Sequence, residues 1–119
     1  MNENRFQNYI NEVELEVSCE KFLEVNKNIL ESIKNSQKYQ KEFDIYNALG
    51  NELRFLIYKI LENKPMCVCA LARIFGKPDS SITYHLKILQ EADLIIGKKQ
   101  GYFTIYYTKN ILLKDLGKK

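Results

Sequence analysis

A chain of 119 residues with 45% hydrophobic and 28% charged side chains has the length and composition of one ordinary globular domain. No apolar run approaches the roughly 20 residues that a membrane span needs, and no basic start followed by an apolar stretch marks a secretory signal, so we expect a cytoplasmic protein without membrane contact. A single histidine, no glycine-rich phosphate loop and no clustered carboxylates leave little from which to build an active site, which argues against an enzyme.

Charge is unevenly spread along the chain, whose formal net charge is +3. Residues 1–40 carry 5 basic and 7 acidic side chains, a net −2, whereas residues 41–119 carry 13 basic and 8 acidic ones, a net +5. The second part is therefore where a polyanion would bind. An excess this mild points to nucleic acid only together with a suitable fold.

The first forty residues contain a long helical pattern after a polar start at residues 1–8. Residues 9–35 contain no glycine or proline, and their apolar positions step by four and three, as in a heptad seam. The seam consists of Leu15, Cys19, Phe22, Asn26, Ile29 and Ile33. Because little of the domain precedes this helix, we expect it to pack against a second copy of itself, so that residues 1–40 form a helical dimerisation segment. Packing of the same stripe on the rest of the domain is the alternative.

The middle of the chain predicts helices separated by short breaks. Residues 35–42 are polar and form a connection or a helical turn. A second helix is expected over residues 43–61, with the Gly-Asn pair at 50–51 as a point where it divides in two. A third is expected over residues 65–75, because a proline favours its start and a glycine its end.

The last third of the chain predicts a fourth helix followed by a β-hairpin. Asp79 is a good N-cap for a helix over residues 80–92. Strands are expected at residues 94–96 and 102–108, joined by a Gly-Lys-Lys-Gln-Gly tip at 97–101. A short last helix is expected after the hairpin, at residues 111–116.

The order helix, tight turn, helix and β-hairpin is that of a winged helix-turn-helix, which we assign to residues 41–119 as a DNA-binding domain. The fold class is therefore mostly α with a small β-hairpin: a winged helix-turn-helix preceded by a long N-terminal dimerisation helix.

The exposed face of the fourth helix carries groups that DNA recognition uses. Its apolar positions face inward, which leaves hydroxyls, an aromatic ring and a lysine outside. These outer residues are Ser80, Thr83, Tyr84 and Lys87. Such groups reach base edges and phosphates in a major groove, and the hairpin tip adds contacts to the adjacent backbone or minor groove. The tip residues are Lys98, Lys99 and Gln100. We expect double-stranded DNA as the partner; a solvated helix face with a generic charged hairpin is the alternative.

Two cysteines stand one residue apart, at Cys67 and Cys69, just before the helix-turn-helix pattern. An odd total of three cysteines does not indicate a disulfide framework, and in a reducing cytosol a close pair favours a metal or redox site. Thiolates select soft ions such as Zn, Cd, Pb, Cu(I) or trivalent arsenic. In a regular helix, side chains two positions apart point about 200° apart, so one ion could be shared only if the helix start unwinds.

Two thiols are few for tight binding, so a third ligand is wanted. Cys19 is the only other cysteine, and it is either that ligand or a small apolar residue of the seam. An ion that distorted the start of the third helix would shift the fourth helix, which packs on it, and would change the DNA contact. Redox sensing and cysteines without an effector role are the alternatives.

Several separate motifs occur in the order found in one family of regulators. They are Ala48-Leu49-Gly50-Asn51-Glu52-Leu53-Arg54, Cys67-Val68-Cys69-Ala70-Leu71-Ala72, Ser80-Ser81-Ile82-Thr83-Tyr84-His85-Leu86-Lys87-Ile88-Leu89, Glu91-Ala92-Asp93-Leu94-Ile95 and Gly101-Tyr102-Phe103-Thr104-Ile105-Tyr106-Tyr107. On these residues the chain, over about half of its length, resembles the ArsR/SmtB family of metal-responsive repressors.

The resemblance implies a homodimeric winged-helix repressor that leaves its operator when an effector binds. It implies that the Cys-Val-Cys box is a site for arsenite-type metalloids or soft divalent metals. It also implies that the fourth helix is the reading helix, the one that contacts DNA bases. Five residues would lie on or beside it, namely Ser80, Ser81, Thr83, Tyr84 and His85. In some relatives a cysteine from the N-terminal segment of the partner subunit completes the metal site, a role that Cys19 would take here.

The chain departs from the family pattern at both of its common metal sites. The arsenic-binding box commonly continues Asp-Leu-Cys, but here Ala72 stands in place of the third thiol. The set of His and acidic residues on the last helix is also absent. The only histidine, His85, lies in the reading helix, where we expect it to pack or to form local hydrogen bonds rather than to hold a metal.

The sequence thus predicts a dimeric, sequence-specific DNA-binding repressor that a thiophilic ion releases from its operator. The ion would be As(III), Cd, Pb or Zn, bound at Cys67 and Cys69 with Cys19 as a third candidate ligand. The first alternative is a winged-helix regulator whose cysteines sense oxidants or have no effector role. The second is a winged-helix module used for protein contacts.

Overall fold

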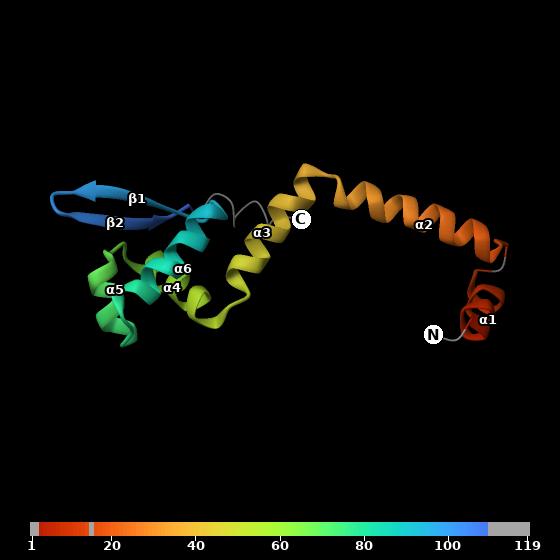
Figure 1. The fold of residues 1–119 in the computed structure, drawn as a ribbon, viewed down its shortest axis with the longest axis horizontal. Coiled ribbons are helices and arrows are strands. Elements are labelled where there is room, and N and C mark those ends of the chain that lie inside the picture. The colour runs from red at the N-terminus through yellow and green to blue at the C-terminus, as the bar shows by residue number, and fades with distance from the viewer. Residues whose placement is uncertain (1–2, 15, 110–119) are drawn as a thin grey trace. The chain divides into compact units, whose positions relative to one another are not determined.

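The computed structural model describes residues 3–14 and 16–109, which contain six helices and one two-stranded antiparallel sheet (Figure 1). The predicted fold class, mostly α with a small β-hairpin in a winged helix-turn-helix, is confirmed. The chain divides into two compact units, residues 1–40 and 41–119. No helix in the described ranges has the length and apolar character that crossing a bilayer would require.

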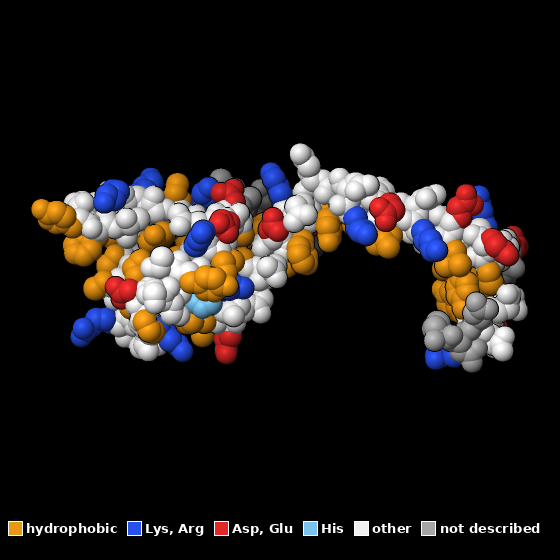
Figure 2. Space-filling model, viewed as in Figure 1, with side chains coloured by type: hydrophobic (Ala, Val, Ile, Leu, Met, Phe, Trp, Pro, Cys, Tyr) orange, Lys and Arg blue, Asp and Glu red, His pale blue; other side chains and the backbone are white. Residues whose placement is uncertain are grey.

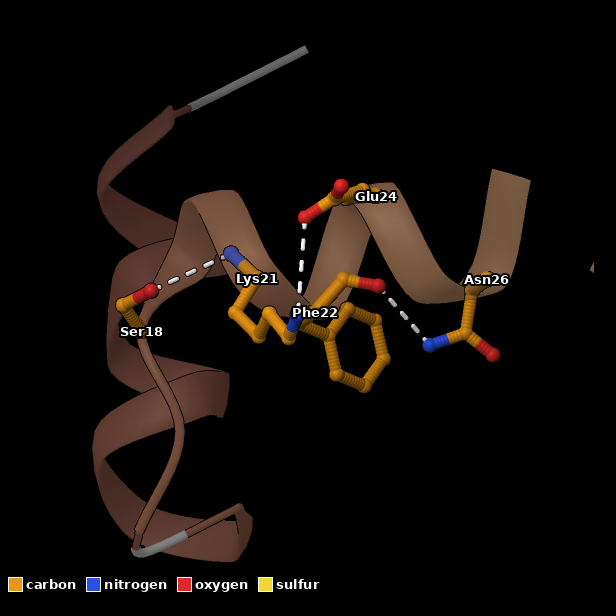
Figure 3. A network of polar contacts seen from close by, with 5 residues as sticks. All are labelled: Ser18, Lys21, Phe22, Glu24 and Asn26. Atoms are coloured by element: carbon orange, nitrogen blue, oxygen red, sulfur yellow. Dashed lines mark hydrogen bonds and ion pairs between the residues drawn. The ribbon is translucent and has the colours of Figure 1, made fainter. Parts of the chain in front are cut away.

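The first unit contains two helices where one was predicted. α1 spans Glu3–Val13 and α2 spans Cys19–Lys34, so the prediction of an unbroken helix over residues 9–35 was wrong. The break ends at Ser18, whose backbone is extended at φ −82° and ψ 162°. The Ser18 hydroxyl accepts a hydrogen bond from the Lys21 backbone N–H at 3.1 Å, which caps α2 (Figure 3). Leu15, the first seam position, lies outside the described residues.

Aromatic rings hold α1 against the start of α2. Phe22 meets Phe6 and Tyr9 edge-on, with ring centroids 5.9 Å apart in both pairs. Ile10 of α1 is also buried, at 2% exposure. Within α2, the Asn26 amide donates to the Phe22 carbonyl at 2.9 Å (Figure 3). The contact is local, so Asn26 is occupied within its own helix.

The rest of α2 leaves a hydrophobic stripe in contact with solvent. The helix buries none of its residues, and its apolar side chains reach the surface along it. The stripe consists of Leu23, Val25, Ile29, Leu30 and Ile33, whose exposure ranges from 41% to 53%. Its 3.6-residue period is that of a helix face which packs on another helix. We call these five residues the α2 stripe.

Two helices follow where the Gly-Asn pair was predicted to divide one. α3 spans Gln37–Leu49 and α4 spans Glu52–Asn63, so the division at residues 50–51 is confirmed. Asn51 is the N-cap of α4, and its side-chain oxygen accepts from the Arg54 backbone N–H at 3.0 Å. Residues 35–42 were predicted to form a connection or a helical turn, and most of them form the first turns of α3, as the second alternative has it.

The helix-turn-helix pair is α5, Val68–Phe75, and α6, Asp79–Glu91. α5 begins three residues later than predicted, because the Met66 carbonyl accepts from the Tyr106 backbone N–H at 3.0 Å and holds Met66 in an extended bridge to β2. Gly76, at φ 64°, ends α5 in the left-handed conformation that glycine adopts readily. The N-cap of α6 is Pro78, not the predicted Asp79, which is the first helical residue.

Asp93 turns the chain from α6 into the hairpin. Its φ of 65° is left-handed, and its N–H donates to the Gln90 carbonyl at 2.9 Å. The Leu94 N–H donates to the Leu89 carbonyl at 3.0 Å, which completes a Schellman motif. The Asp93 carboxylate also pairs with the Lys109 ammonium. The start of the hairpin is thereby fixed to the end of α6.

The hairpin is longer than predicted and its tip is shorter. β1 spans Ile95–Gln100 and β2 spans Phe103–Thr108. The predicted tip at residues 97–101 was wrong, because all but its last residue pair with β2 and only Gly101 and Tyr102 form the turn. A Cβ on Gly97 would lie 2.9 Å from Thr104 and 3.0 Å from the Tyr106 ring, so that glycine makes room for its neighbours and does not turn the chain. The predicted helix at 111–116 lies outside the described residues.

One hydrophobic core lies in the second unit, among α3, α4, α5, α6 and the base of the hairpin. Its described members are Ile45, Ala48, Ile57, Tyr58, Leu61, Leu71, Ala72, Ile82, Leu86, Leu89, Ala92, Leu94 and Ile95. Three of them, Ile82, Leu86 and Leu89, come from the inward side of α6, as its sequence periodicity indicated. The core therefore fixes which side of α6 faces outward.

Candidate nucleic-acid interface and thiol pair

The outer side of α6 presents four of the predicted DNA contacts together. Ser80, Thr83, Tyr84 and Lys87 are all exposed, and the Tyr84 side chain is 60% exposed. Hydroxyl groups can donate and accept, a phenol can do both, and an ammonium group donates to phosphate or to guanine. The arrangement offers a major groove both base-reading and phosphate-binding groups.

The other two predicted α6 residues lie on its flank. Ser81 and His85 are half-buried, on the side of α6 that faces α4. The Arg54 guanidinium of α4 lies against this flank, with Nη1 3.3 Å from Nδ1 of His85. His85 therefore bonds locally, as expected, and lies at the margin of the outer side of α6.

Arg54 joins three elements of the second unit. Its Nε donates to the Ala48 carbonyl at 2.7 Å, and its Nη2 lies 3.4 Å from the Asn47 carbonyl. Both carbonyls belong to the last turn of α3, where helix carbonyls have no partner within the helix. Arg54 belongs to one of the family motifs in the sequence, but the sequence predicted no role for it. The one signal for a role was an arginine one turn into a helix that follows a Gly-Asn break.

The environment of His85 favours its neutral form. Burial comes first, and the positive charges of Arg54 and Lys77 act in the same direction, so the pKa of His85 lies below its ordinary value. Neutral imidazole keeps one nitrogen as an acceptor and the other as a donor. His85 can therefore offer DNA a directional hydrogen bond but no positive charge near pH 7.

The three predicted hairpin residues are exposed but belong to strand β1 rather than to a loop. Lys98 lies over the Tyr107 ring, with Nζ 5.9 Å from its centroid, and the Gln100 amide donates to the Tyr107 hydroxyl at 3.5 Å. Lys99 pairs with Thr104 in the ladder and so points to the other side of the sheet. The two lysines thus lie on opposite sides of the β1–β2 hairpin, which is the wing of the winged helix-turn-helix.

Hydrophobic side chains, not charges, gather at the tip of the hairpin (Figure 2). Tyr102 is 100% exposed, and Phe103 beside it is 55% exposed. Sequence reasoning assigned the tip to lysines, because it read Gly97 as a turn residue. The actual tip carries two aromatic rings and the lysines lie along the strand behind it.

The thiol pair sits at the start of α5 in two different conformations. Cys67 is the N-cap, extended at φ −90° and ψ 171°, and is half-buried; Cys69 is helical and exposed. The objection that both cysteines belong to one regular helix therefore does not hold, since Cys67 stands outside it. No side-chain hydrogen bond caps α5. In residues 3–14 and 16–109, no three His, Cys, Asp or Glu side chains gather in a way that could hold a metal ion.

Cys19, the third candidate ligand, is the first residue of α2 in the other unit. Its thiol donates to the side-chain oxygen of Gln7, with Sγ 3.1 Å from Oε1. The structure thus places Cys67 and Cys69 together and Cys19 in a separate unit, where it has a local partner. All three cysteines are free thiols.

Comparison with known proteins bears on this helix-turn-helix and wing. Residues 51–96, which hold α4, α5 and α6, match the family described as bacterial regulatory protein, arsR family. An HTH-type transcriptional regulator of Methanocaldococcus jannaschii is 36% identical over 81 residues, which cover 67% of this chain and 91% of that protein. The arsenical resistance operon repressor of Bacillus subtilis is 35% identical over 71 residues, which cover 59% of this chain and 65% of that one.

Solved structures share the fold. A homodimeric winged helix-turn-helix DNA-binding domain from Mycobacterium bovis matches with a TM-score of 0.60 over 65% of this chain and 71% of that chain, at 21% sequence identity. At that identity the likeness concerns the architecture of helices and hairpin.

Proposed function

Because the chain belongs to the arsR family of bacterial regulatory proteins, we propose that it is a dimeric repressor which binds a specific operator through α6 and the wing and leaves it when a thiophilic ion binds Cys67 and Cys69. Its family consists of transcriptional regulators, not enzymes.

The observation that carries the DNA-binding part is the outer side of α6. Four polar side chains are exposed there on one helix, which the core holds from behind. The wing adds Lys98 and Lys99 beside it, and the unit that contains both elements has the positive share of the charge. Recognition helices of this kind enter a major groove while the wing contacts the neighbouring backbone or minor groove.

The α2 stripe supports dimerisation. Five exposed apolar side chains along one helix make a hydrophobic surface that a soluble monomer would not keep in water. A helix with such a stripe packs well against a copy of itself, which would also place two reading helices for two half-sites of an operator. The structurally similar Mycobacterium bovis domain is described as homodimeric.

The start of α5 supplies a path from the thiols to the DNA-binding elements. Met66, next to Cys67, is bridged to Tyr106 of β2, and the Cys67 carbonyl accepts from the Leu71 N–H at 3.1 Å in α5. An ion that drew the two thiols together would have to move one of these attachments. Since α5 packs on α6, the wing and the reading helix would change their relative positions.

DNA binding is tested by fluorescence anisotropy on a duplex that the wild-type protein enriches from a randomised library. We expect Lys87→Ala to weaken binding and to reduce its salt dependence by about one released counterion, because a phosphate contact is lost. Lys59→Ala is the matched control: Lys59 is exposed on α4 and pairs with Glu62 at 2.9 Å. Equal losses for the two variants would remove α6 from the interface.

Release is tested by titrating Cd, Pb, Zn and arsenite against the same duplex. We expect at least one of these ions to weaken DNA binding of the wild type and to leave the Cys67→Ser/Cys69→Ser variant bound. A Cys19→Ser variant decides whether the third thiol belongs to the site, because loss of a ligand lowers ion affinity by a large factor. If no ion changes DNA binding of the wild type, the metal-sensing part of the proposal fails while the DNA-binding part stands.

One observation favours oxidant sensing as a second candidate. Cys69 is exposed, and the described part of the chain gathers only two thiols at α5. Exposed thiols are the ones that peroxide reaches. Treatment with hydrogen peroxide followed by dithiothreitol would then weaken and restore DNA binding in the wild type and leave the double serine variant unaffected.

A further inference from the structure

The contact between Arg54 and His85 determines which nitrogen of the histidine ring carries the proton. A guanidinium group has five N–H donors, no acceptor, and keeps its proton at any ordinary pH. Nη1 of Arg54 lies 3.3 Å from Nδ1 of His85, in a geometry that suits a hydrogen bond. Nδ1 must therefore be the unprotonated nitrogen, and the proton of the neutral ring must lie on Nε2.

The arginine is itself held in place. Nε and Nη2 are directed to the Ala48 and Asn47 carbonyls, so two arms of the planar fork are occupied at the end of α3. The third arm is left to meet His85. A planar guanidinium group that is held at two nitrogens has little freedom to turn its third nitrogen away from His85. The fold itself therefore maintains the histidine contact.

Burial and the charged groups near His85 disfavour the charged ring. The charged groups that act on it are Arg54 from α4 and Lys77 from the turn before α6, and both are cationic. The ring of Tyr84 lies edge-on beside it, with centroids 5.1 Å apart. No carboxylate is paired with His85 in the described ranges. The ring is thus neutral near pH 7 and has one acceptor, which Arg54 occupies.

We propose that Arg54 locks His85 as its Nε2–H tautomer, so that the margin of the reading helix offers DNA a hydrogen-bond donor there and no acceptor. The inference rests on the proposed function, because it assigns that donor to an acceptor atom of the duplex. Purine N7 in the major groove and phosphate oxygens are acceptors of this kind, whereas the amino groups of adenine and cytosine are not. Arg54 is then a positioning residue that selects what the helix can read.

The first test uses the full-length protein without DNA. Two-dimensional ¹H–¹⁵N spectra of the imidazole ring distinguish the two tautomers, and the assignment is direct because the chain has one histidine. We expect the Nε2–H pattern at pH 7.5 in the wild type and a mixture of tautomers in Arg54→Gln. Arg54→Lys, which keeps the charge but loses the fork, should resemble Arg54→Gln. An Nδ1–H pattern or a mixture in the wild type would overturn the proposal.

The second test compares two amides at position 85 on the library-selected duplex. A glutamine amide reaches about as far as Nε2 and keeps an outer donor, whereas an asparagine amide reaches only as far as Nδ1. We expect His85→Asn to lose about 3- to 10-fold in DNA affinity, as for one hydrogen bond, and His85→Gln to retain most of it. Equal loss in both variants, with unchanged folding by circular dichroism, would contradict a donor role.

The acceptor is located by changing the DNA one atom at a time. A 7-deazapurine at the contacted base, or a methylphosphonate at the contacted phosphate, should weaken the wild type and leave His85→Asn unchanged; which of the two does so identifies the acceptor. If no position shows this dependence, the donor does not contact DNA. A wild type that selects no duplex at all would refute the proposed function, while the ring spectra would still decide the tautomer.

Discussion

The two units of the chain treat their hydrophobic side chains in opposite ways. In residues 41–119, the described chain gathers thirteen buried hydrophobic residues into one cluster. In the described part of residues 1–40, Ile10 is the one buried hydrophobic residue, while the α2 stripe is about half exposed. The net charges differ as well, at +5 for the second unit and −2 for the first.

This difference separates two sources of stability. Apolar surface stabilises a fold by about 25 cal/mol for each Å² that is removed from water, so the second unit gains its stability within one chain. The described part of the first unit buries one hydrophobic residue, so burial within that unit contributes little to its stability. We infer that the DNA-reading unit is stable by itself and that the helical unit depends on association.

The largest expected effect comes from the same substitution made in both units. Leu89 of α6 is 0% exposed and Leu30 of α2 is 53% exposed. Leu89→Ala should lower the free energy of unfolding by about 2–5 kcal/mol, because it leaves a cavity in a closed core. Leu30→Ala should cost less than about 1 kcal/mol in dilute protein, where the stripe faces water. Hydrogen exchange measured as a function of urea reports the first value at the α6 amides and the second at the α2 amides.

An equal loss in the two variants would break the comparison. It would mean that Leu30 is buried in the dilute protein and that the first unit has a core of its own.

The next effect concerns association. Ile29→Asp places a carboxylate in the α2 stripe, and a dimer would have to bury two of them, so we expect dimerisation to weaken at least about 100-fold. Asn28→Asp is the matched control, because it adds the same charge at an exposed position about 100° around α2, outside the stripe, and should change the dimer constant less than about threefold. Sedimentation equilibrium measures both. A monomeric wild type, or equal effects of the two variants, would end the assignment of the stripe to a dimer.

The sequence predicted the elements of the second unit better than those of the first. The break between α3 and α4 could be read because the Gly-Asn pair supplies both a helix end and an N-cap. The break before α2 could not, because residues 14–18 contain no glycine or proline and the apolar period continues across them. There the chain turns because Phe22 packs on two rings of α1, a contact that no local pattern contains.

Site residues divide in the same way between local and non-local causes. The outer side of α6 follows from its periodicity, because the core takes one side and leaves the other. The role of Arg54 does not, since it contacts a ring 31 positions away in the chain. The hairpin tip was misplaced because glycine is common in turns, so Gly97 was assigned to the turn. The position requires a glycine because the ring of Tyr106 lies directly across the ladder from it.

Tyr58 gives a smaller effect that belongs to the second unit alone. Its hydroxyl is buried without a hydrogen-bond partner among the described residues, so Tyr58→Phe should leave the unfolding free energy at pH 7 unchanged or raise it by up to about 1 kcal/mol. Burial, with a contribution from Glu62, raises the pKa of Tyr58 from 10.0 to about 12. The folded state therefore holds this proton more tightly than the unfolded state does, and stability falls relative to its value at lower pH as the pH rises from 10 to 12.

Urea titrations of both proteins from pH 8 to pH 11 isolate this fall in stability. The wild type should lose about 1 kcal/mol more than Tyr58→Phe by pH 11, since the lysines titrate alike in both. Parallel pH profiles would show that the hydroxyl is ionisable without cost, and hence that this part of the core admits water.

The smallest effect lies on the acidic side and also belongs to the second unit, which holds the only histidine. Burial, Arg54 and Lys77 lower the pKa of His85 below 6.5, so the folded protein disfavours the charged ring, and the edge-on Tyr84 ring offers it no counter-charge. The stability that His85 contributes is therefore complete above pH 6.5 and is lost as the pH falls through the lowered folded-state pKa. His85→Gln cannot titrate, so the unfolding free energy of the wild type should fall more steeply than that of the variant between pH 7 and pH 5. If the two profiles fall together, protonation of the imidazole costs the folded protein no stability, and the Arg54 guanidinium therefore does not hold the ring in the folded state.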